Sequence, residues 1–207
     1  IPRAVTIAVA GAGPRMGTTT QAMQILNYLS TMEYKVAFVE MSGQRHMGQY
    51  LGILDKSEAL DDAHFTLMGN HFYNDAKGLI TARSQFDYVV CDYGVYNDIP
   101  DITSFFEKDV KIVCCGAKPW ESPWLEPAFG DDDGTLRYIF SFVQKSDEAM
   151  VRDQMGDEAK NTYFAPYAPD FFRYCGADEI YERIIDPKTN RPKHPQTKGK
   201  RFWPWQK

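Results

Sequence analysis

Residues 5–20 constrain the fold of this chain more than any other stretch. The short apolar run Val5–Ala10 is typical of a buried strand, and it ends at a glycine-rich turn. A helical pattern follows, because apolar residues recur at intervals of three and four between Ala22 and Leu29. A strand, a glycine loop and a helix start in succession bring unpaired backbone N–H groups and the positive end of the helix dipole together. The sequence therefore predicts an anion-binding site at this turn.

Strand-like and helix-like stretches alternate along most of the chain. The apolar, strand-like runs are Val5–Ala10, Val36–Glu40, Tyr88–Cys91, Val110–Cys115, Tyr138–Val143 and Thr162–Ala165. The helix-like stretches are Thr18–Ser30, about Asp75–Arg83 and Asp147–Met155. This alternation predicts an α/β fold with a doubly wound, mostly parallel sheet covered by helices on both faces, in three α/β/α layers. At 207 residues the chain suits one such domain, predicted over residues 1–186.

Residues His64–Asp75 interrupt the alternation. Two short apolar runs within this stretch flank Gly69-Asn70, which predicts a hairpin whose turn begins with glycine. The histidines of the chain show no metal-ligand spacing, so His64 and His71 are predicted to be surface or half-buried strand residues.

The glycine loop fits the register of a Walker A P-loop, except that Thr18 stands where the phosphate-binding lysine is expected. In a P-loop, backbone N–H groups wrap the phosphates, the lysine bridges the outer phosphates and a Ser or Thr hydroxyl binds Mg²⁺. Thr19 occupies that hydroxyl position, and Arg15 is the candidate for the missing cation. The predicted cofactor-binding residues are Gly13, Pro14, Arg15, Met16, Gly17, Thr18, Thr19 and Thr20. The alternative is a tight strand–helix turn that binds nothing.

Two acidic residues follow strand-like runs. Glu40 ends the run Val36–Glu40, and Asp92 lies at the end of the run Phe86–Gly94. The carboxyl ends of neighbouring parallel strands converge on the crevice that also receives the glycine loop. A carboxylate there can hold Mg²⁺ or its waters, or orient an attacking water. Glu40 and Asp92 are therefore the predicted catalytic residues, and Thr19 and Asp92 the predicted metal ligands.

With these residues the chain resembles the ParA/MinD family of P-loop ATPases, the deviant Walker A group, from about Val5 to Phe172. The 22 residues from Thr18 to Glu40 suit the spacing of that family. The resemblance implies a P-loop NTPase architecture of the SIMIBI/MinD type. It also implies ATP or ADP with Mg²⁺ as cofactors, a protein partner and a homodimer. By position, Thr19 would be the Mg²⁺ ligand and Asp92 the Walker B acid, and loops after the late strands would help to hold the base.

Three positions depart from the pattern of that family. Its signature lysine early in the loop falls at Gly13, its second lysine falls at Thr18, and its second acid after strand two falls at Ser42. Because those residues support nucleotide-dependent dimerisation and hydrolysis in the family, the departures predict weak or absent ATPase activity. The role expected is in localisation, partitioning or assembly. The pattern resembles an atypical branch of the family, the TadZ-like pilus-assembly localisation proteins.

A competing interpretation is an NAD(P)-binding Rossmann-type oxidoreductase. Gly11 and Gly13 supply the first two glycines of that fingerprint, and Glu40 could bind a ribose hydroxyl. The third glycine, however, falls at Met16, and the threonines that open the helix suit Mg²⁺ and phosphate better than pyrophosphate alone.

Charge is distributed unevenly along the chain. The net charge of −5 argues against a general nucleic-acid binder, but residues 187–207 hold seven Lys and Arg and no acid. Residues 1–186 keep 16 basic and 28 acidic residues, a net charge of −12. The last ten residues combine cations with Phe202, Trp203 and Trp205, which predicts peripheral contact of 198–207 with an anionic membrane. The alternative is a solubilising tail or one that packs on a partner.

The four cysteines form no C-x-x-C pair, and three lie in strand-like runs, which predicts buried thiols in a reducing compartment. No stretch of 18 uninterrupted apolar residues occurs, and no signal peptide is visible. These observations predict a cytoplasmic protein, peripheral to the inner face of the membrane where the tail makes contact.

Overall fold

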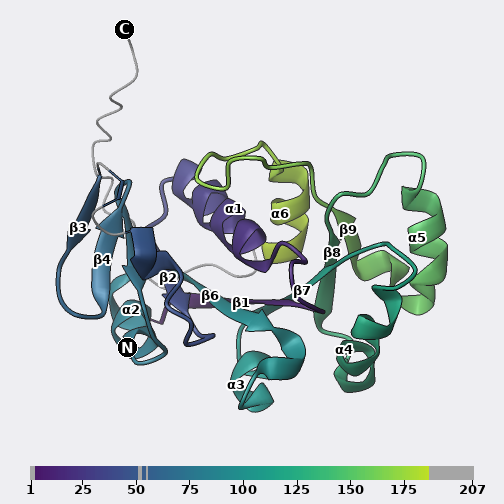
Figure 1. Ribbon diagram of the computed structural model, residues 1–207, viewed down its shortest axis with the longest axis horizontal. Helices are drawn as coiled ribbons and strands as arrows, with labels where there is room; N and C mark the ends of the chain where they lie inside the picture. The colour runs from purple at the N-terminus through teal and green to yellow at the C-terminus, as the bar shows by residue number, and fades with distance from the viewer. Residues whose placement is uncertain (1–2, 51–52, 55, 187–207) are drawn as a thin grey trace, which may run out of the picture.

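The middle layer of the protein is one sheet, as the computed structural model shows for residues 3–50, 53–54 and 56–186 (Figure 1). Its strands are β1 (Val5–Gly11), β2 (Val36–Glu40), β3 (Ser57–Ala59), β4 (His64–Leu67), β5 (Asn70–Tyr73), β6 (Tyr88–Val95), β7 (Val110–Cys115), β8 (Leu136–Phe140) and β9 (Thr162–Phe164). The α-helices are α1 (Thr18–Thr31), α2 (Gly78–Gln85), α3 (Ile102–Phe106), α4 (Glu126–Asp131), α5 (Glu148–Gln154) and α6 (Asp178–Ile185). The predicted tail, residues 187–207, lies outside the described residues.

The strands follow the order β3-β4-β5-β2-β6-β1-β7-β8-β9. Neighbouring strands from β5 to β9 in this order run parallel, and only the β3–β4 and β4–β5 pairs are antiparallel. The predicted doubly wound, mostly parallel α/β sheet is therefore confirmed. Because parallel strands all point the same way, their carboxyl ends lie along one edge of the sheet, and the loop between β1 and α1 opens there.

Helices cover both faces of the sheet. Helices α1 and α6 lie above it in Figure 1, and α2, α3 and α4 lie below. Strand β1 is buried along its whole length, with Ile7 and Val9 in the core beneath α1 and Ala8 and Ala10 in the core on the other face. The predicted apolar face of α1 is fully buried, at Ala22, Ile25, Leu26 and Leu29. This burial fixes the position of the helix whose first turn follows the glycine loop.

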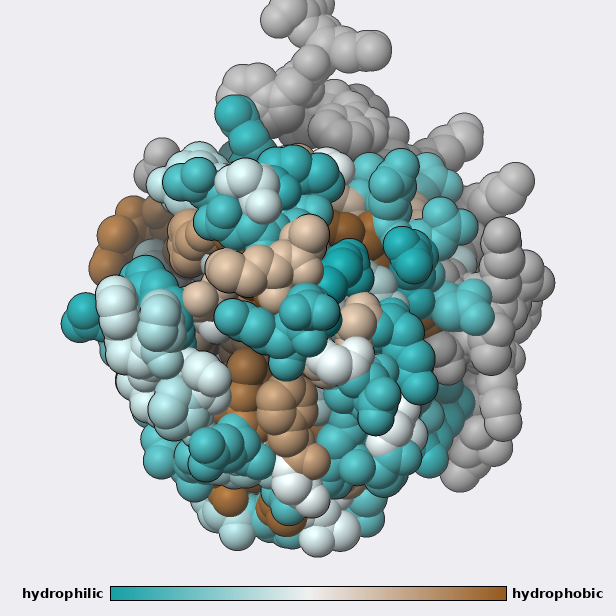
Figure 2. All heavy atoms as spheres, turned by 90° about the vertical axis from the view of Figure 1, so that its right-hand side faces the viewer, coloured by the Kyte–Doolittle hydropathy of each residue, from teal (hydrophilic) through white to brown (hydrophobic). Residues whose placement is uncertain are grey.

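The end of the molecule at the right of Figure 1 carries α4 and α5, and Figure 2 looks directly onto it. Polar side chains cover most of this surface, with small groups of apolar atoms between them. The exposed large apolar side chains on these two helices are Phe129 and Met150. This end of the protein therefore offers no broad apolar face among the described residues.

The predicted hairpin is present as β4 and β5, but its turn is displaced by one residue. Leu67 pairs with Asn70, so Met68 and Gly69 form the turn, with φ values of 53° and 84°. A two-residue hairpin turn with positive φ at both positions places glycine second, and the prediction that glycine comes first was wrong. The two histidines are half-buried on these strands as predicted, with His64 Nε2 2.9 Å from His71 Nδ1.

Several element boundaries differ from the prediction. Strand β6 continues past Asp92 to Val95, and β8 ends at Phe140 instead of residue 143. Phe142 has φ 61°, a left-handed conformation that cannot extend a strand. Helices α3, α4 and α6 were not predicted, and each has eight residues or fewer. Helix α6 does have an apolar face, with Tyr181, Ile184 and Ile185 buried, which the sequence analysis did not identify.

All four cysteines are free thiols, and Cys91, Cys114 and Cys115 are buried as predicted. Burial raises the pKa of the Cys91 thiol to about 12, so it remains protonated at neutral pH. Among the described residues, no helix has the length and apolar composition needed to cross a membrane.

Candidate functional site

The loop between β1 and α1 adopts a conformation that only part of its sequence favours. Gly17 precedes α1 with φ 81°, where glycine carries no steric cost, whereas Arg15 holds φ 61° despite its side chain. The Ala12 N–H donates a 2.8 Å hydrogen bond to the Cys114 carbonyl, which ties the loop to β7. No side chain caps the start of α1, so its first N–H groups face the carboxyl edge of the sheet.

A cavity of about 280 Å³ lies over the loop. It is lined by Gly13, Arg15, Met16, Gly17, Thr18, Thr19, Thr20, Ser42, Gln44, His46, Asp92, Gly94 and Val95. The structure thus brings together most of the predicted loop residues and Asp92, while Pro14 and Glu40 do not line the cavity. We call it the phosphate cavity, after the ligand that the sequence predicts there. Residues of the segment 42–46 line the cavity as well. Only Ser42 of this segment was identified from the sequence as part of the site.

Thr19 and Asp92 meet at the floor of the phosphate cavity. The Thr19 hydroxyl donates a 2.7 Å hydrogen bond to Asp92 Oδ2, and the Gly94 N–H donates to Asp92 Oδ1 at 3.0 Å. Asp92 is only 4% exposed, and this burial raises its pKa above the usual aspartate value, although the Thr19 hydrogen bond opposes the shift. A hydroxyl oxygen beside a carboxylate is a donor set that fits Mg²⁺, which takes oxygen ligands and keeps several waters.

Glu40 holds a loop and does not face the phosphate cavity. It is 2% exposed, its Oε1 accepts a 2.8 Å hydrogen bond from the His46 N–H, and its Oε2 accepts one of 3.1 Å from the Met47 N–H. The Ser42 hydroxyl adds a 3.3 Å bond to Oε1. Both carboxylate oxygens therefore accept hydrogen bonds from the segment that follows β2. In this structure Glu40 positions the segment that follows β2. Nothing here tests the catalytic role expected for it, which stays a prediction.

The positions that correspond to the two missing lysines both lie close to other residues, and the space at Gly13 is filled. A Cβ atom on Gly13 would clash with the ring of Trp124, from the 3-10 turn η3 (Ser122–Leu125). The Thr18 hydroxyl lies against Gly11, where a Cβ on that glycine would clash with it. Sequence reasoning missed Trp124, since nothing in the order of residues indicates that the loop after β7 packs on the glycine loop.

The loop after β7 also carries an acidic residue, Glu121. The Glu121 carboxylate accepts a hydrogen bond from the Lys118 N–H at 3.1 Å, and its other oxygen lies 3.6 Å from Lys118 Nζ. Trp120 from the same loop is exposed, with Lys118 Nζ 5.7 Å from its ring centre. Lys118 is therefore engaged within its own loop, and it does not line the phosphate cavity.

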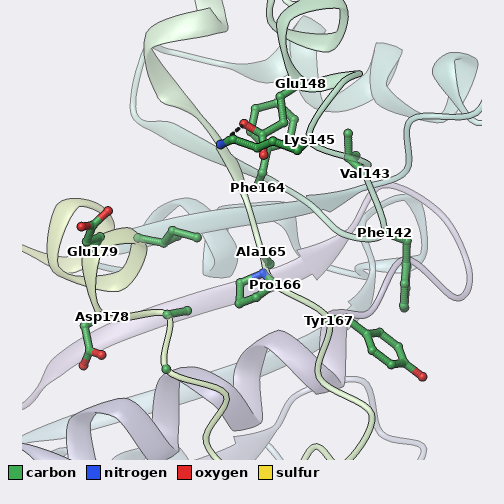
Figure 3. Close-up of a pocket in the computed structure, with 13 residues that line it drawn as sticks. Phe142, Val143, Lys145, Glu148, Phe164, Ala165, Pro166, Tyr167, Asp178 and Glu179 are labelled. Atoms are coloured by element: carbon green, nitrogen blue, oxygen red, sulfur yellow. Dashed lines mark hydrogen bonds and ion pairs between the residues drawn. The ribbon is translucent and has the colours of Figure 1, made fainter.

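A second cavity, of about 640 Å³, opens where β8 and β9 end (Figure 3). Phe142 and Tyr167 lie at its rim on the same side of Pro166, 72% and 69% exposed, with ring centres 5.8 Å apart. Ser141, the neighbour of Phe142, accepts a 3.4 Å hydrogen bond from Gln21 and would contact a Cβ on Gly17. The rim of this second cavity therefore adjoins the glycine loop.

The strand order weighs against a dinucleotide-binding domain. In the usual Rossmann order the second strand lies directly beside the first, which brings its terminal acid close to the glycine loop. Here β6 separates β2 from β1, and the Glu40 carboxylate binds backbone N–H groups instead of facing a ligand.

No family model matches the sequence, and no curated protein matches it either. Solved structures do resemble it. The MinD cell division protein of Aquifex aeolicus has a TM-score of 0.65 at 11% identity, over 93% of this chain and 100% of that one. A plasmid partition protein from Borrelia burgdorferi B31 bound to AMPPNP has a TM-score of 0.61 at 14% identity, over 90% and 98%. The ATP complex of a Cyanothece McdA variant has a TM-score of 0.60 at 15% identity, over 95% and 100%.

These similarities extend over nearly the whole of each chain. At such low identities they show the fold, which is that of the ParA/MinD P-loop ATPases, and they confirm the predicted architecture.

Proposed function

We propose that this protein binds an adenine nucleotide, ATP or ADP, together with Mg²⁺ at the glycine loop. In this proposal it acts in localisation, partitioning or assembly through partner contacts, with weak or absent ATPase activity. The observation that carries the proposal is the hydrogen bond between Thr19 and Asp92 at the uncapped start of α1. Two of the similar structures are a cell division protein and a plasmid partition protein, which agrees with this role.

In this proposal, some groups at the loop bind the phosphates and others bind the metal. Backbone N–H groups of the loop and of the first turn of α1 bind phosphate oxygens, assisted by the helix dipole. Thr19 Oγ1 and the Asp92 carboxylate hold Mg²⁺, which when bound neutralises charge on the phosphates. The Gly94 N–H keeps the carboxylate in its orientation.

The proposal of weak hydrolysis depends on charges that are missing. Phosphoryl transfer is accelerated mainly by positioning and by charges that stabilise the transferring group. Gly13 lies under Trp124, Thr18 lies against Gly11, and Ser42 stands at the position of the second acid. Among the described residues that line the phosphate cavity, Arg15 is the one permanent cation. The barrier to hydrolysis therefore stays high while nucleotide binding is retained.

The base has a candidate position beside the phosphates. Phe142 and Tyr167 expose two aromatic rings next to Ser141, which adjoins the glycine loop. Aromatic rings of this kind stack on a nucleobase. In the proposal the nucleotide extends from the glycine loop to these two rings.

Partner contacts are proposed at the same edge of the sheet. Trp120, Phe142 and Tyr167 are exposed on loops that follow β7, β8 and β9, and large exposed aromatic residues are enriched at protein interfaces. A protein partner or a second copy of this chain would cover them. Residues 198–207 are the proposed contact with an anionic membrane, and the proposed location is the cytoplasm.

The test is a nucleotide panel. We expect ATP or ADP with Mg²⁺ to raise the melting temperature, GTP to raise it less, and NAD to leave it unchanged. Asp92→Asn should remove the dependence on Mg²⁺, and the matched control Asp98→Asn, at an exposed site in the loop after β6, should not.

Three outcomes would each contradict part of the proposal. Stabilisation by NAD and not by ATP would favour the dinucleotide-binding interpretation. Equal Mg²⁺ dependence in wild type and Asp92→Asn would remove the proposed metal ligand. Phosphate release that is abolished in Asp92→Asn would instead show a working ATPase.

A further inference from the structure

The segment after β2 is held at the rim of the phosphate cavity by a buried carboxylate. Glu40 accepts hydrogen bonds from the backbone N–H groups of His46 and Met47. The Met47 side chain is itself buried in the core beneath α1. The backbone of His46 is therefore fixed on one side by a carboxylate and on the other by an apolar anchor.

The side chain of His46 borders two cavities. It lines the phosphate cavity with Thr19 and Thr20, and with the same two residues it lines an adjoining apolar cavity of about 480 Å³ that reaches Tyr50. Its imidazole is exposed, so it can exchange protons with solvent. His46 is close enough to Asp92 for a positive charge on its imidazole to lower the pKa of that carboxyl slightly, against the larger raising effect of burial.

Other charged groups around His46 leave it free to meet an anion. Arg45, on the same segment, is engaged with Asp75 at 4.0 Å, and Glu40 is occupied by backbone N–H groups. Asp92 from β6 and Arg15 from the glycine loop face the same cavity. A bound triphosphate carries several negative charges, and neither lysine of a P-loop is present to meet them.

We propose that His46, positioned by Glu40, contacts the outer phosphates of the bound nucleotide and supplies a cation when its imidazole is protonated. This inference rests on the proposed function and adds a pH response to it. Because phosphate oxygens favour the charged form of an imidazole, nucleotide binding should be accompanied by proton uptake. The contribution of His46 to affinity should therefore fall as the pH rises.

The experiment is calorimetric titration with ATP and Mg²⁺ between pH 5.5 and 7.5, in two buffers of different ionisation enthalpy. Titration of the phosphates and of Asp92 also changes affinity with pH, so wild type is compared with His46→Gln at each pH. We expect wild type to bind about tenfold more tightly than His46→Gln at pH 5.5, since a charge-assisted hydrogen bond contributes about 1.5 kcal/mol or more. The two affinities should converge by pH 7.5, and proton uptake should be lost in the variant.

Two further variants separate contact from positioning. His46→Lys should bind well at both ends of the pH range, because an ammonium stays charged throughout. Glu40→Gln should weaken the pH response while His46 is still present. His64→Gln is the matched control, since His64 lies on β4 and lines neither cavity.

The outcomes distinguish this inference from the proposed function. If wild type and His46→Gln bind nucleotide with the same pH dependence and proton uptake, the role of His46 is overturned and the proposed function stands. If wild type binds neither ATP nor ADP at any pH, and Thr18→Lys does not restore binding, both are overturned.

Discussion

The indole of Trp124 lies against the backbone of Gly13, in the space that any side chain at residue 13 would need. The two residues come from different loops, one after β1 and one after β7, and they are packed together at the carboxyl edge of the sheet. By position in the sequence, the signature lysine of the ParA/MinD family falls at this residue. The packing therefore gives a steric reason for glycine at a position where the resemblance leads one to expect a lysine.

Restoring that lysine should destabilise the protein. We expect Gly13→Lys to lower the melting temperature by several degrees, because overpacking a well-filled site costs about 1–3 kcal/mol. Adding Trp124→Ala should recover part of the loss by opening the space. Gly130→Lys is the matched control, since a side chain there meets open space. Equal melting temperatures for Gly13→Lys and the control would contradict the packing argument.

Replacing Thr18 by lysine should strengthen ATP binding. An ammonium at this position would reach the outer phosphates, and a charge-assisted hydrogen bond contributes about 1.5–3 kcal/mol, which is roughly tenfold or more in affinity. Calorimetric titration measures the change, with Thr31→Lys at the far end of α1 as a control of equal charge. Unchanged affinity would mean that the loop does not hold a triphosphate in the Walker geometry. If Arg15 supplies the present cation, Arg15→Ala should weaken binding.

Asp92→Asn should stabilise the metal-free protein at neutral pH. Burial raises the pKa of Asp92 in the folded state above the value of about 3.9 in an unfolded chain. Between those two values the folded protein holds the extra proton, so stability declines as pH rises through that window. Ionised Asp92 therefore costs stability at pH 7. Urea unfolding in EDTA should show a gain for Asp92→Asn at pH 7 that vanishes below about pH 4, whereas Asp98→Asn should show no such trend.

Phe142→Ala and Tyr167→Ala should each weaken ATP binding. Stacking of a base on an aromatic ring contributes about 1–3 kcal/mol, so a loss of about fivefold or more is expected. Tripolyphosphate, which has no base, should bind wild type and both variants equally. Trp120→Ala serves as the control, because Trp120 is exposed but lines neither cavity. Equal losses for ATP and tripolyphosphate would place the effect on the phosphate loop instead of the base.

Deleting residues 198–207 should weaken binding to vesicles that contain anionic lipid. The segment holds four cations, each contributing about 1 kcal/mol near an anionic surface, and two tryptophans. Sedimentation with anionic and with neutral vesicles measures the effect, and salt should reduce it. The melting temperature should stay nearly unchanged. A large fall in melting temperature would show instead that the tail contributes to the core.

Local patterns were enough to predict much of this fold. The spacing of apolar residues identified β1, α1 and most of the parallel strands, because burial on a helix or strand repeats with a fixed period. The register of the glycine loop and the placement of Asp92 after a buried run likewise predicted the residues that the phosphate cavity brings together. Short helices such as α3 were not predicted, since five residues are too few to show a helical period.

Tertiary structure alone decided how these residues are used. Thr19 and Asp92 are 73 positions apart in sequence, and only the placement of β6 beside β1 brings them into a hydrogen bond. Glu40 ends its strand as predicted, yet its carboxylate is directed to the backbone of the following segment. Trp124 fills the space over Gly13 because β7 lies next to β1. The sequence determined which residues end strands and open helices through local periodicity, whereas strand order and side-chain packing are long-range contacts that no local period encodes.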